Sequence, residues 1–165
     1  MSKSDEALRE AFAGESQANR RYLAFAEAAD KEGYPQVAKM FRAAAESETV
    51  HALSHLRALK AVKDTRGNLQ EAIEGETHEF KNMYPAMMET AKSEGNKEAL
   101  MSFYRANAVE QIHAKMYEGL LDNLGKIKET YSYYVCPVCG YVHEKEAPDA
   151  CPICGTKGKL FVKID

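Results

Sequence analysis

Two Glu-x-x-His tetrads constrain the fold of this 165-residue chain more than any other feature. The tetrads are Glu48-Thr-Val-His51 and Glu110-Gln-Ile-His113, and a further glutamate precedes each, Glu15 by 33 residues and Glu76 by 34. A carboxylate and an imidazole at positions i and i+3 project from the same face of an α-helix. Four helices with these side chains turned inward provide the ligands for a pair of metal ions. The sequence therefore predicts a four-helix bundle around a carboxylate-bridged di-iron centre.

Helical periodicity extends through residues 4–125, with apolar side chains at alternating steps of three and four. Breaks are predicted at Gly33-Tyr-Pro35, at residues 64–68 and at Gly95-Asn96, and Gly125 closes the last helix. The six candidate ligands lie in the apolar stripes, where a glutamate is costly unless it is paired or bound to metal. Buried salt bridges would require Lys or Arg on these stripes, which contain none, so metal binding is favoured.

The two halves of the helical region repeat. Gly14-Glu15 matches Gly75-Glu76 at an offset of 61, whereas Tyr22, Glu48 and His51 match Tyr84, Glu110 and His113 at an offset of 62. A duplicated helix pair predicts a metal site with near-twofold symmetry. Glu79, one helical turn after Glu76, breaks this symmetry because its counterpart is Ala18. One metal ion should therefore have an additional carboxylate.

All four cysteines lie near the C-terminus, in the two motifs Cys136-Pro-Val-Cys139-Gly and Cys151-Pro-Ile-Cys154-Gly. Paired Cys-x-x-Cys loops of this kind form a tetrahedral site whose sulfurs accept hydrogen bonds from backbone amides. The spacing suits both iron and zinc. A disulfide scaffold would distribute its cysteines along the fold, so the clustering favours a metal site in a reducing cytoplasm.

The composition excludes several other classes. A net charge of −3 and a pI near 6.0 argue against binding to nucleic acid. The apolar stretches are short and interrupted by charge, so no membrane span is expected. The charged N-terminal residues lack the apolar core of a signal peptide, which again favours a cytoplasmic protein.

Taken together, these motifs resemble the rubrerythrins, non-haem iron peroxidases in which a ferritin-like di-iron domain precedes a rubredoxin-like domain. The shared motifs are Gly14-Glu15-Ser16-Gln17, Glu48-x-x-His51, Gly75-Glu76-x-x-Glu79, Met83-Tyr84-Pro85, Glu110-x-x-His113 and both cysteine loops. The resemblance covers essentially the whole chain. It implies a mainly α fold, with a ferritin-like four-helix domain over residues 1–130 and a small rubredoxin-like β domain over residues 131–165.

The resemblance also implies roles for individual residues. Glu48 and Glu110 would bridge the two irons, Glu15 with Glu79 or His51 would complete one iron, and Glu76 with His113 the other. Glu79 would bind the diferric form and His51 the diferrous form, since an anionic ligand favours the more highly charged ion. The predicted catalytic residues are Glu79, His51, Tyr22 and Tyr84, although both tyrosines also suit an ordinary core. Cys136, Cys139, Cys151 and Cys154 would hold a single iron, with zinc as the alternative.

The function implied is reduction of hydrogen peroxide to water in defence against oxidative stress. Electrons would reach the di-iron site one at a time through the four-cysteine iron, from rubredoxin or a NAD(P)H-linked reductase. The chain has no Gly-x-Gly-x-x-Gly motif of its own, so the donor should hold the nicotinamide. Two alternatives stay open: a ferroxidase that handles iron with oxygen, and a helical binding scaffold with a zinc ribbon. The four-cysteine domain disfavours the first and the buried glutamates disfavour the second.

The short connection between the second and third helices predicts an exchange of helices between subunits. A ferritin-like bundle places these helices parallel, which requires a crossover of about 30 Å if the second helix extends about 18 Å beyond His51. Residues 64–68 span about 17 Å when extended. Either the two helices form an antiparallel hairpin, or the third and fourth helices join a second subunit. We expect the latter, a helix-swapped homodimer.

Overall fold

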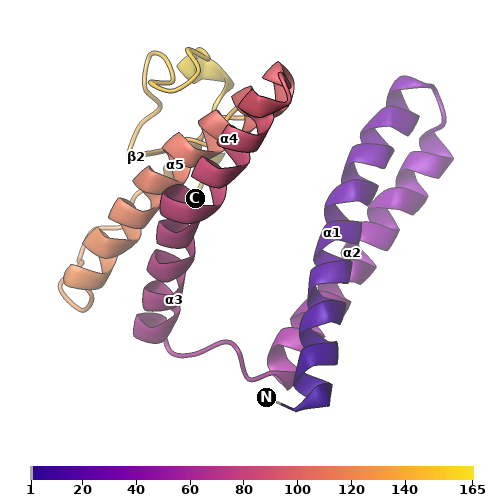
Figure 1. Cartoon of the computed structure of the whole chain (residues 1–165), viewed down its shortest axis with the longest axis horizontal. Helices are drawn as coiled ribbons and strands as arrows, with labels where there is room; N and C mark the ends of the chain where they lie inside the picture. The colour runs from indigo at the N-terminus through magenta and orange to yellow at the C-terminus, as the bar shows by residue number, and fades with distance from the viewer. Residues whose placement is uncertain (1) are drawn as a thin grey trace. The chain divides into compact units, whose positions relative to one another are not determined.

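The structure, a computed structural model, describes residues 2–165, and the chain divides into two compact units. One unit ends at Lys63 and the other is Asp64–Asp165. The elements in chain order are α1 (Lys3–Lys31), α2 (Pro35–Ala58), α3 (Thr65–His78), the π-helix η1 (Glu79–Met83), α4 (Tyr84–Ser93), α5 (Lys97–Asp122), β1 (Tyr133–Val135), β2 (Val142–Glu144), the 3₁₀-helix η2 (Gly158–Leu160) and β3 (Val162–Ile164). Figure 1 labels the five α-helices and β2. The predicted fold class, mainly α with a small four-cysteine β region, is confirmed. Within the described chain, no helix has the length and apolar character that crossing a membrane requires.

The first unit is a hairpin of α1 and α2, which lie side by side in Figure 1. Helix α1 begins with a capping box, in which the Asp5 amide donates to Ser2 Oγ at 3.1 Å and the Ser2 amide donates to Asp5 Oδ2 at 3.0 Å. Gly33 ends the helix with a φ of 83°, which favours glycine, and Pro35 opens α2. The break predicted at this point is confirmed.

Small residues let the two helices of this hairpin approach closely. Ala26, Ala29 and Ala38 are almost fully buried and pack with Phe41. Many larger apolar side chains of the hairpin stay exposed: Leu23, Phe25, Tyr34, Val37, Met40, Val50 and Leu53. Two helices share only one interface, so apolar residues on their other faces need a further partner.

The second unit begins earlier than the sequence pattern indicated. The Asp64 carboxylate accepts a hydrogen bond from the Gly67 amide at 2.8 Å and caps α3, which starts at Thr65. The break predicted at residues 64–68 was therefore misplaced. The actual connection is residues 59–64, because a capping aspartate makes the polar stretch after it the first turn of a helix.

A π-helix interrupts the third helical stretch, which the periodicity indicated as a single helix. Helix α3 ends at His78, η1 covers Glu79–Met83, and α4 continues with Pro85 in its first turn. Proline lacks an amide hydrogen and its ring crowds the carbonyl four residues earlier, which the wider π turn accommodates. A π turn also adds one residue to a helix. It falls between Glu76 and Tyr84, where the repeat offset changes from 61 to 62.

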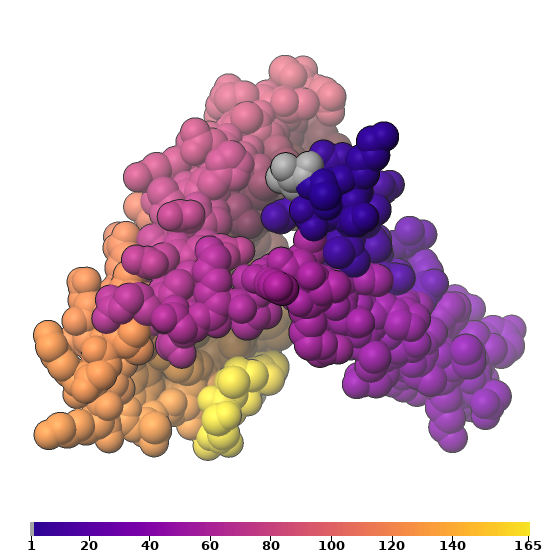
Figure 2. All heavy atoms as spheres, turned by 90° about the horizontal axis from the view of Figure 1, so that it is seen from below, coloured from indigo at the N-terminus to yellow at the C-terminus, as the bar shows by residue number. Residues whose placement is uncertain are grey.

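The C-terminal region forms an antiparallel sheet of three short strands in the order β2-β1-β3. Tyr134 in the central strand pairs with His143 of β2 and Lys163 of β3. Strand β2 packs against α5, so the sheet belongs to the same unit as α3, α4 and α5. Strand β3 is exposed, and the C-terminal residues are visible in yellow on the surface of this unit in Figure 2.

Candidate metal centres

The first unit brings together three of the predicted di-iron ligands. Glu15 lies on α1, and Glu48 and His51 lie on α2. The Nδ1 atom of His51 is 2.9 Å from Glu48 Oε2 and 3.9 Å from Glu15 Oε1. One ligand atom of each residue lies within 4.8 Å of the others. We call these three residues the first triad.

The second unit repeats this geometry with Glu76 on α3 and with Glu110 and His113 on α5, the second triad. The Nδ1 atom of His113 is 2.9 Å from Glu110 Oε2 and 3.7 Å from Glu76 Oε1. Each histidine thus turns Nδ1 toward two carboxylates. Two carboxylate oxygens and one imidazole nitrogen form a donor set that suits iron.

The packing around the two triads repeats as well. The rings of Tyr22 and Phe41 lie 6.1 Å apart at 32°, and those of Tyr84 and Phe103 lie 6.3 Å apart at 38°. These pairs are related by the sequence offset of 62. The internal repeat is therefore a repeat in three dimensions, with the ligands and their aromatic neighbours in equivalent places.

The electrostatics of the second triad fit a bound cation. Burial, and then the negative charge of Glu110, raise the pKa of Glu76 to about 7. The hydrogen bond to Glu110 raises the pKa of His113, against the lowering effect of burial. Two half-buried carboxylates thus face each other, and their like charges repel. A metal cation bound at His113 Nδ1 would reduce this repulsion.

Three further polar side chains face the second triad. Burial and the Glu110 charge raise the pKa of Glu79, which is half-buried at the start of η1. The pKa of Tyr84 is raised by burial and by the charges of Glu110, Glu79 and Glu76. The pKa of Tyr117 is raised by burial and by Glu76 and Glu110. The structure thus places the predicted Glu79 and Tyr84 beside the carboxylates, whereas Tyr22 lies in an aromatic cluster with Phe25 and Phe41.

Tyr117 was not among the predicted site residues. Its signal was its position, one helical turn after His113 on the same stripe of α5. It also lines a cavity of about 260 Å³ between α5 and the sheet, together with His113, Met116, Leu120, Tyr133 and Val142.

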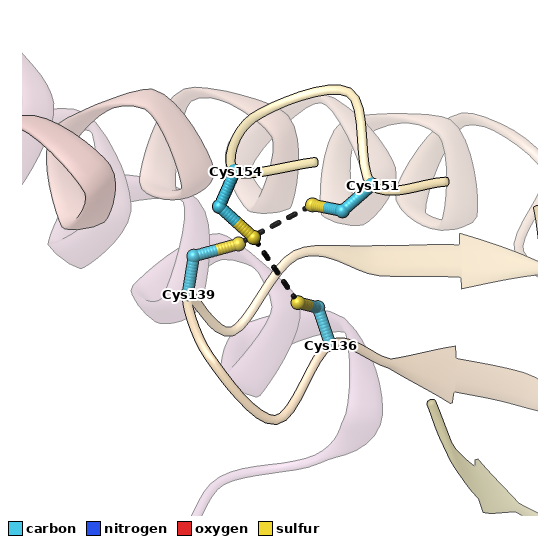
Figure 3. A group of neighbouring side chains, drawn as sticks. All are labelled: Cys136, Cys139, Cys151 and Cys154. Atoms are coloured by element: carbon cyan, nitrogen blue, oxygen red, sulfur yellow. Dashed lines mark hydrogen bonds between the residues drawn. The ribbon is translucent and has the colours of Figure 1, made fainter. Parts of the chain in front are cut away.

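The four cysteines converge from two loops, as Figure 3 shows. The Sγ atoms of Cys136 and Cys154 are 3.5 Å apart, and those of Cys139 and Cys151 are 3.4 Å apart. A tetrahedron of thiolates with metal–sulfur bonds of about 2.3 Å has edges of about 3.8 Å. All four thiols are free, so the structure places them as a metal site and not as disulfides.

The four-cysteine site lies against the second triad. Gly140, directly after Cys139, approaches Val109 on α5. The backbone carbonyl of Gly140 also lies near the His113 imidazole and contributes to its raised pKa. The buried His113 Nε2 has no hydrogen-bond partner among the described residues, so this polar contact is longer than a full hydrogen bond. The residue directly after a cysteine ligand thus packs against the helix that carries Glu110 and His113.

A helical carboxylate–histidine centre joined to a four-cysteine centre defines a class of non-haem metalloproteins with two metal centres. The family model for rubrerythrin matches residues 6–121, and that for the rubrerythrin rubredoxin-like domain matches residues 134–162. Rubrerythrin-2 of Clostridium acetobutylicum is 40% identical over 93% of this chain and 92% of its own length. Rubrerythrin of Porphyromonas gingivalis is 39% identical over 97% of this chain and 89% of its own. A solved structure of partially reduced nigerythrin covers 99% of this chain and 88% of its own, at 31% identity and a TM-score of 0.61.

The chain therefore belongs to the rubrerythrin family, and the resemblance drawn from its motifs is confirmed. Proteins of this family are generally oxidoreductases with a di-iron site and a rubredoxin-like four-cysteine site. The predicted cofactors, two non-haem irons and one iron held by cysteines, agree with this assignment and with the clustered ligands. The assignment of each residue to one iron stays a prediction.

Proposed function

We propose that this protein reduces hydrogen peroxide to water, consuming two electrons and two protons for each O–O bond broken, as a defence against oxidative stress. The observation that carries the proposal is the packing of the four-cysteine region against α5, the helix that carries Glu110 and His113 of the second triad. A protein that only stored iron would have no need for this connection. When bound, the two irons supply the two electrons and act as Lewis acids toward the peroxide oxygens.

Protons for the two water molecules can come from the side chains around the second triad. Glu79 is half-buried beside Glu110, and its raised pKa makes it a better proton donor near neutral pH than an exposed glutamate. The proximity of Tyr84 to the same carboxylates supports its predicted role in holding them. Tyr22 packs in the equivalent position of the first unit and is proposed for the same role there.

An iron at the four-cysteine site would supply one-electron chemistry, and the packing of Gly140, the residue after Cys139, beside Val109 of α5 supports a route from this site toward the second triad. The donor would be a redox protein such as rubredoxin or a NAD(P)H-linked reductase, which the rubredoxin-like domain supports. Free thiols that must stay reduced also support a reducing compartment, such as the cytoplasm. We propose domain limits of 1–130 and 131–165, which the two matched regions support.

The proposal is tested by reducing the iron-loaded protein without oxygen, adding one equivalent of hydrogen peroxide, and following the visible ferric-thiolate absorption by stopped flow. We expect colour to return much faster with peroxide than with oxygen, because peroxide would take two electrons from the di-iron site and the four-cysteine iron would return one of them. Faster oxidation by oxygen would favour the ferroxidase. A protein that stays colourless would contradict the relay and favour zinc in the cysteine site.

We further propose that the di-iron site is completed by helix exchange in a homodimer, with the first triad from one chain and the second triad from its partner. The connection between α2 and α3 supports this proposal. Ala58 lies about 10 Å beyond His51 along α2, and Glu76 lies about 16 Å beyond Thr65 along α3. If α2 and α3 of one chain were parallel in the same bundle, the connection between them would have to span about 27 Å.

The first residues of that connection are folded back onto the end of α2. The Lys60 amide donates to Arg57 O at 3.0 Å, and the Ala61 amide donates to Leu56 O at 3.1 Å. The remaining steps from Ala61 to Thr65 span about 14 Å at most. A return within one chain is therefore out of reach, and the alternative to exchange is a plain antiparallel hairpin. The exposed apolar residues of α1 and α2 support exchange, because a partner would bury them.

Co-expression of two inactive variants tests the exchange. One variant carries Glu48→Ala and His51→Ala, and the other carries Glu110→Ala and His113→Ala. In a swapped heterodimer, the intact first triad of one chain meets the intact second triad of the other, so one of its two sites should bind iron and reduce peroxide. Heterodimers with no active site, or a stable iron-loaded monomer in size-exclusion chromatography, would exclude the exchange.

A further inference from the structure

The two cysteine loops have nearly the same backbone conformation. Gly140 and Gly155, each following the second cysteine, have φ angles of 81° and 74°. The Cys136 amide donates to Tyr141 O and the Cys151 amide donates to Thr156 O, both at 2.8 Å. Tyr141 and Thr156 therefore occupy equivalent positions, two residues after the second cysteine of each loop.

The loops differ in what these two hydroxyl groups do. Thr156 Oγ1 lies 3.0 Å from Cys154 Sγ. The Tyr141 hydroxyl points elsewhere and lies 2.9 Å from His143 Nδ1. A cysteine that binds metal is a thiolate and has no proton to give, so the Thr156 hydroxyl must be the donor. The second loop thus has one side-chain hydrogen bond to sulfur that the first loop lacks.

We propose that Thr156 is a positioning residue that raises the reduction potential of the four-cysteine iron centre through this O–H···S hydrogen bond. Reduction adds one electron and breaks no bond, and the added electron increases the negative charge on the sulfurs. A donor to sulfur therefore stabilises the reduced form more than the oxidised form.

The position of Thr156 suits this role. It is half-buried, so its hydroxyl competes only in part with water for the Cys154 sulfur. Cys154 is itself half-buried, whereas Cys136 and Cys151 are almost fully buried. The Thr156 hydroxyl thus donates its hydrogen bond to Cys154, one of the two less buried cysteines of the site. A higher potential makes electron uptake from an external donor more favourable, whichever oxidant the di-iron site consumes.

The test is a spectroelectrochemical titration of the ferric-thiolate absorption in the full, iron-loaded protein. Thr156→Val keeps the shape of the side chain and removes the hydroxyl. We expect it to shift the ferrous-to-ferric ratio at a fixed potential up to roughly tenfold toward ferric, as suits a hydrogen bond to a charged group. For a one-electron couple, this lowers the midpoint by up to about 59 mV. Thr156→Ser keeps the hydroxyl and should keep the wild-type midpoint.

Tyr141→Phe is the matched control, because it removes the equivalent hydroxyl from the loop in which no hydroxyl faces the sulfur. Its midpoint should equal that of the wild type. An unchanged midpoint in Thr156→Val, or an equal fall in Tyr141→Phe, would overturn the proposal. If Thr156→Val does not load iron, the pair Thr156→Ala and Thr156→Ser makes the same comparison. The readout needs no peroxide, so it stands apart from the test of the proposed peroxidase activity.

Discussion

The two triads contain the same residue types at nearly the same distances, but they differ in their surroundings. The His51 side chain is 53% exposed, whereas that of His113 is 23% exposed. The helix that carries Glu15 is uninterrupted, whereas the stretch that carries Glu76 contains the π turn and Glu79. Within the second unit, the four-cysteine region packs against α5, which carries Glu110 and His113. The two halves thus share the same candidate ligands, but the residues packed around those ligands differ.

Because of this difference, we expect His51 and His113 to have different roles as ligands. His113 contacts Glu110 at 2.9 Å and is largely shielded from water, which suits a permanent ligand. The His51 side chain contacts Glu48 and is more than half exposed within the first unit. An exposed histidine and an additional carboxylate are the two components that the expected exchange between His51 and Glu79 requires. The asymmetry therefore supports that exchange.

The largest expected effect comes from replacing each histidine in turn. His113→Gln should lower the rate of peroxide reduction by at least about a hundredfold, because it removes a ligand and the contact to the four-cysteine region. His51→Gln should cost about tenfold, since Glu79 can still complete the same iron in its oxidised form. Steady-state turnover and iron content check both variants. Equal losses would contradict the proposed difference between the two triads.

A deletion within the π turn tests the second difference. Removing Asn82, an exposed residue of η1, should convert the turn to ordinary α-helix and leave α3 and α4 in register with α5. Glu79 would then rotate away from Glu110, and we expect a loss of about ten- to a hundredfold in peroxide turnover with a folded, iron-binding protein. Asn82→Ala keeps the chain length and should keep the activity. Full activity after the deletion would show that Glu79 is dispensable.

Much of this asymmetry was present in the sequence, but only part of it could be interpreted there. The two Glu-x-x-His pairs, the helix break at Gly33 and Pro35, and the two Cys-x-x-Cys loops follow from local spacing, which the chain keeps when it folds. The change of repeat offset between Glu76 and Tyr84 was visible, but periodicity alone does not distinguish a π turn from a loop residue. The start of α3 at Thr65 depends on one side-chain cap by Asp64. The approach of Gly140 to His113 is a tertiary contact across a linker, for which no local pattern exists.

The raised pKa of Glu76 gives a smaller, pH-dependent effect in metal-free protein. Its pKa is about 7 in the folded chain and 4.5 by its ordinary value, so the folded state binds the proton more tightly than the unfolded state. The corresponding stability is fully present below pH 4.5 and is lost as the pH rises through about 7. Because water screens this partly exposed carboxylate, the contribution should be about 1 kcal/mol, well below the full value of about 1.4 kcal/mol per pKa unit.

Chemical denaturation of metal-free protein between pH 4.5 and pH 8 measures this dependence. Glu76→Gln cannot ionise and should flatten it, whereas Glu15→Gln at the equivalent position of the first triad serves as the matched comparison. The same pH dependence in wild type and Glu76→Gln would show that Glu76 is not the titrating group. Iron loading should also suppress the dependence, because a bound cation favours the ionised carboxylate.

The smallest expected effect is that of Tyr117, which has no equivalent near the first triad. The residue at the matching offset of 62 in α2 is His55, so the hydroxyl beside Glu76 and Glu110 is specific to the second half. Tyr117→Phe keeps the packing of the ring and removes only that hydroxyl. We expect peroxide turnover to fall severalfold, with its pH profile displaced, because one group that can hold a proton near the carboxylates is lost. Tyr131→Phe is a suitable control, since its hydroxyl bonds Glu144, outside both triads. If turnover and its pH profile are unchanged in Tyr117→Phe, Tyr117 contributes only to packing. The functional difference between the two triads would then depend on Glu79 and on the packing of Gly140 against α5.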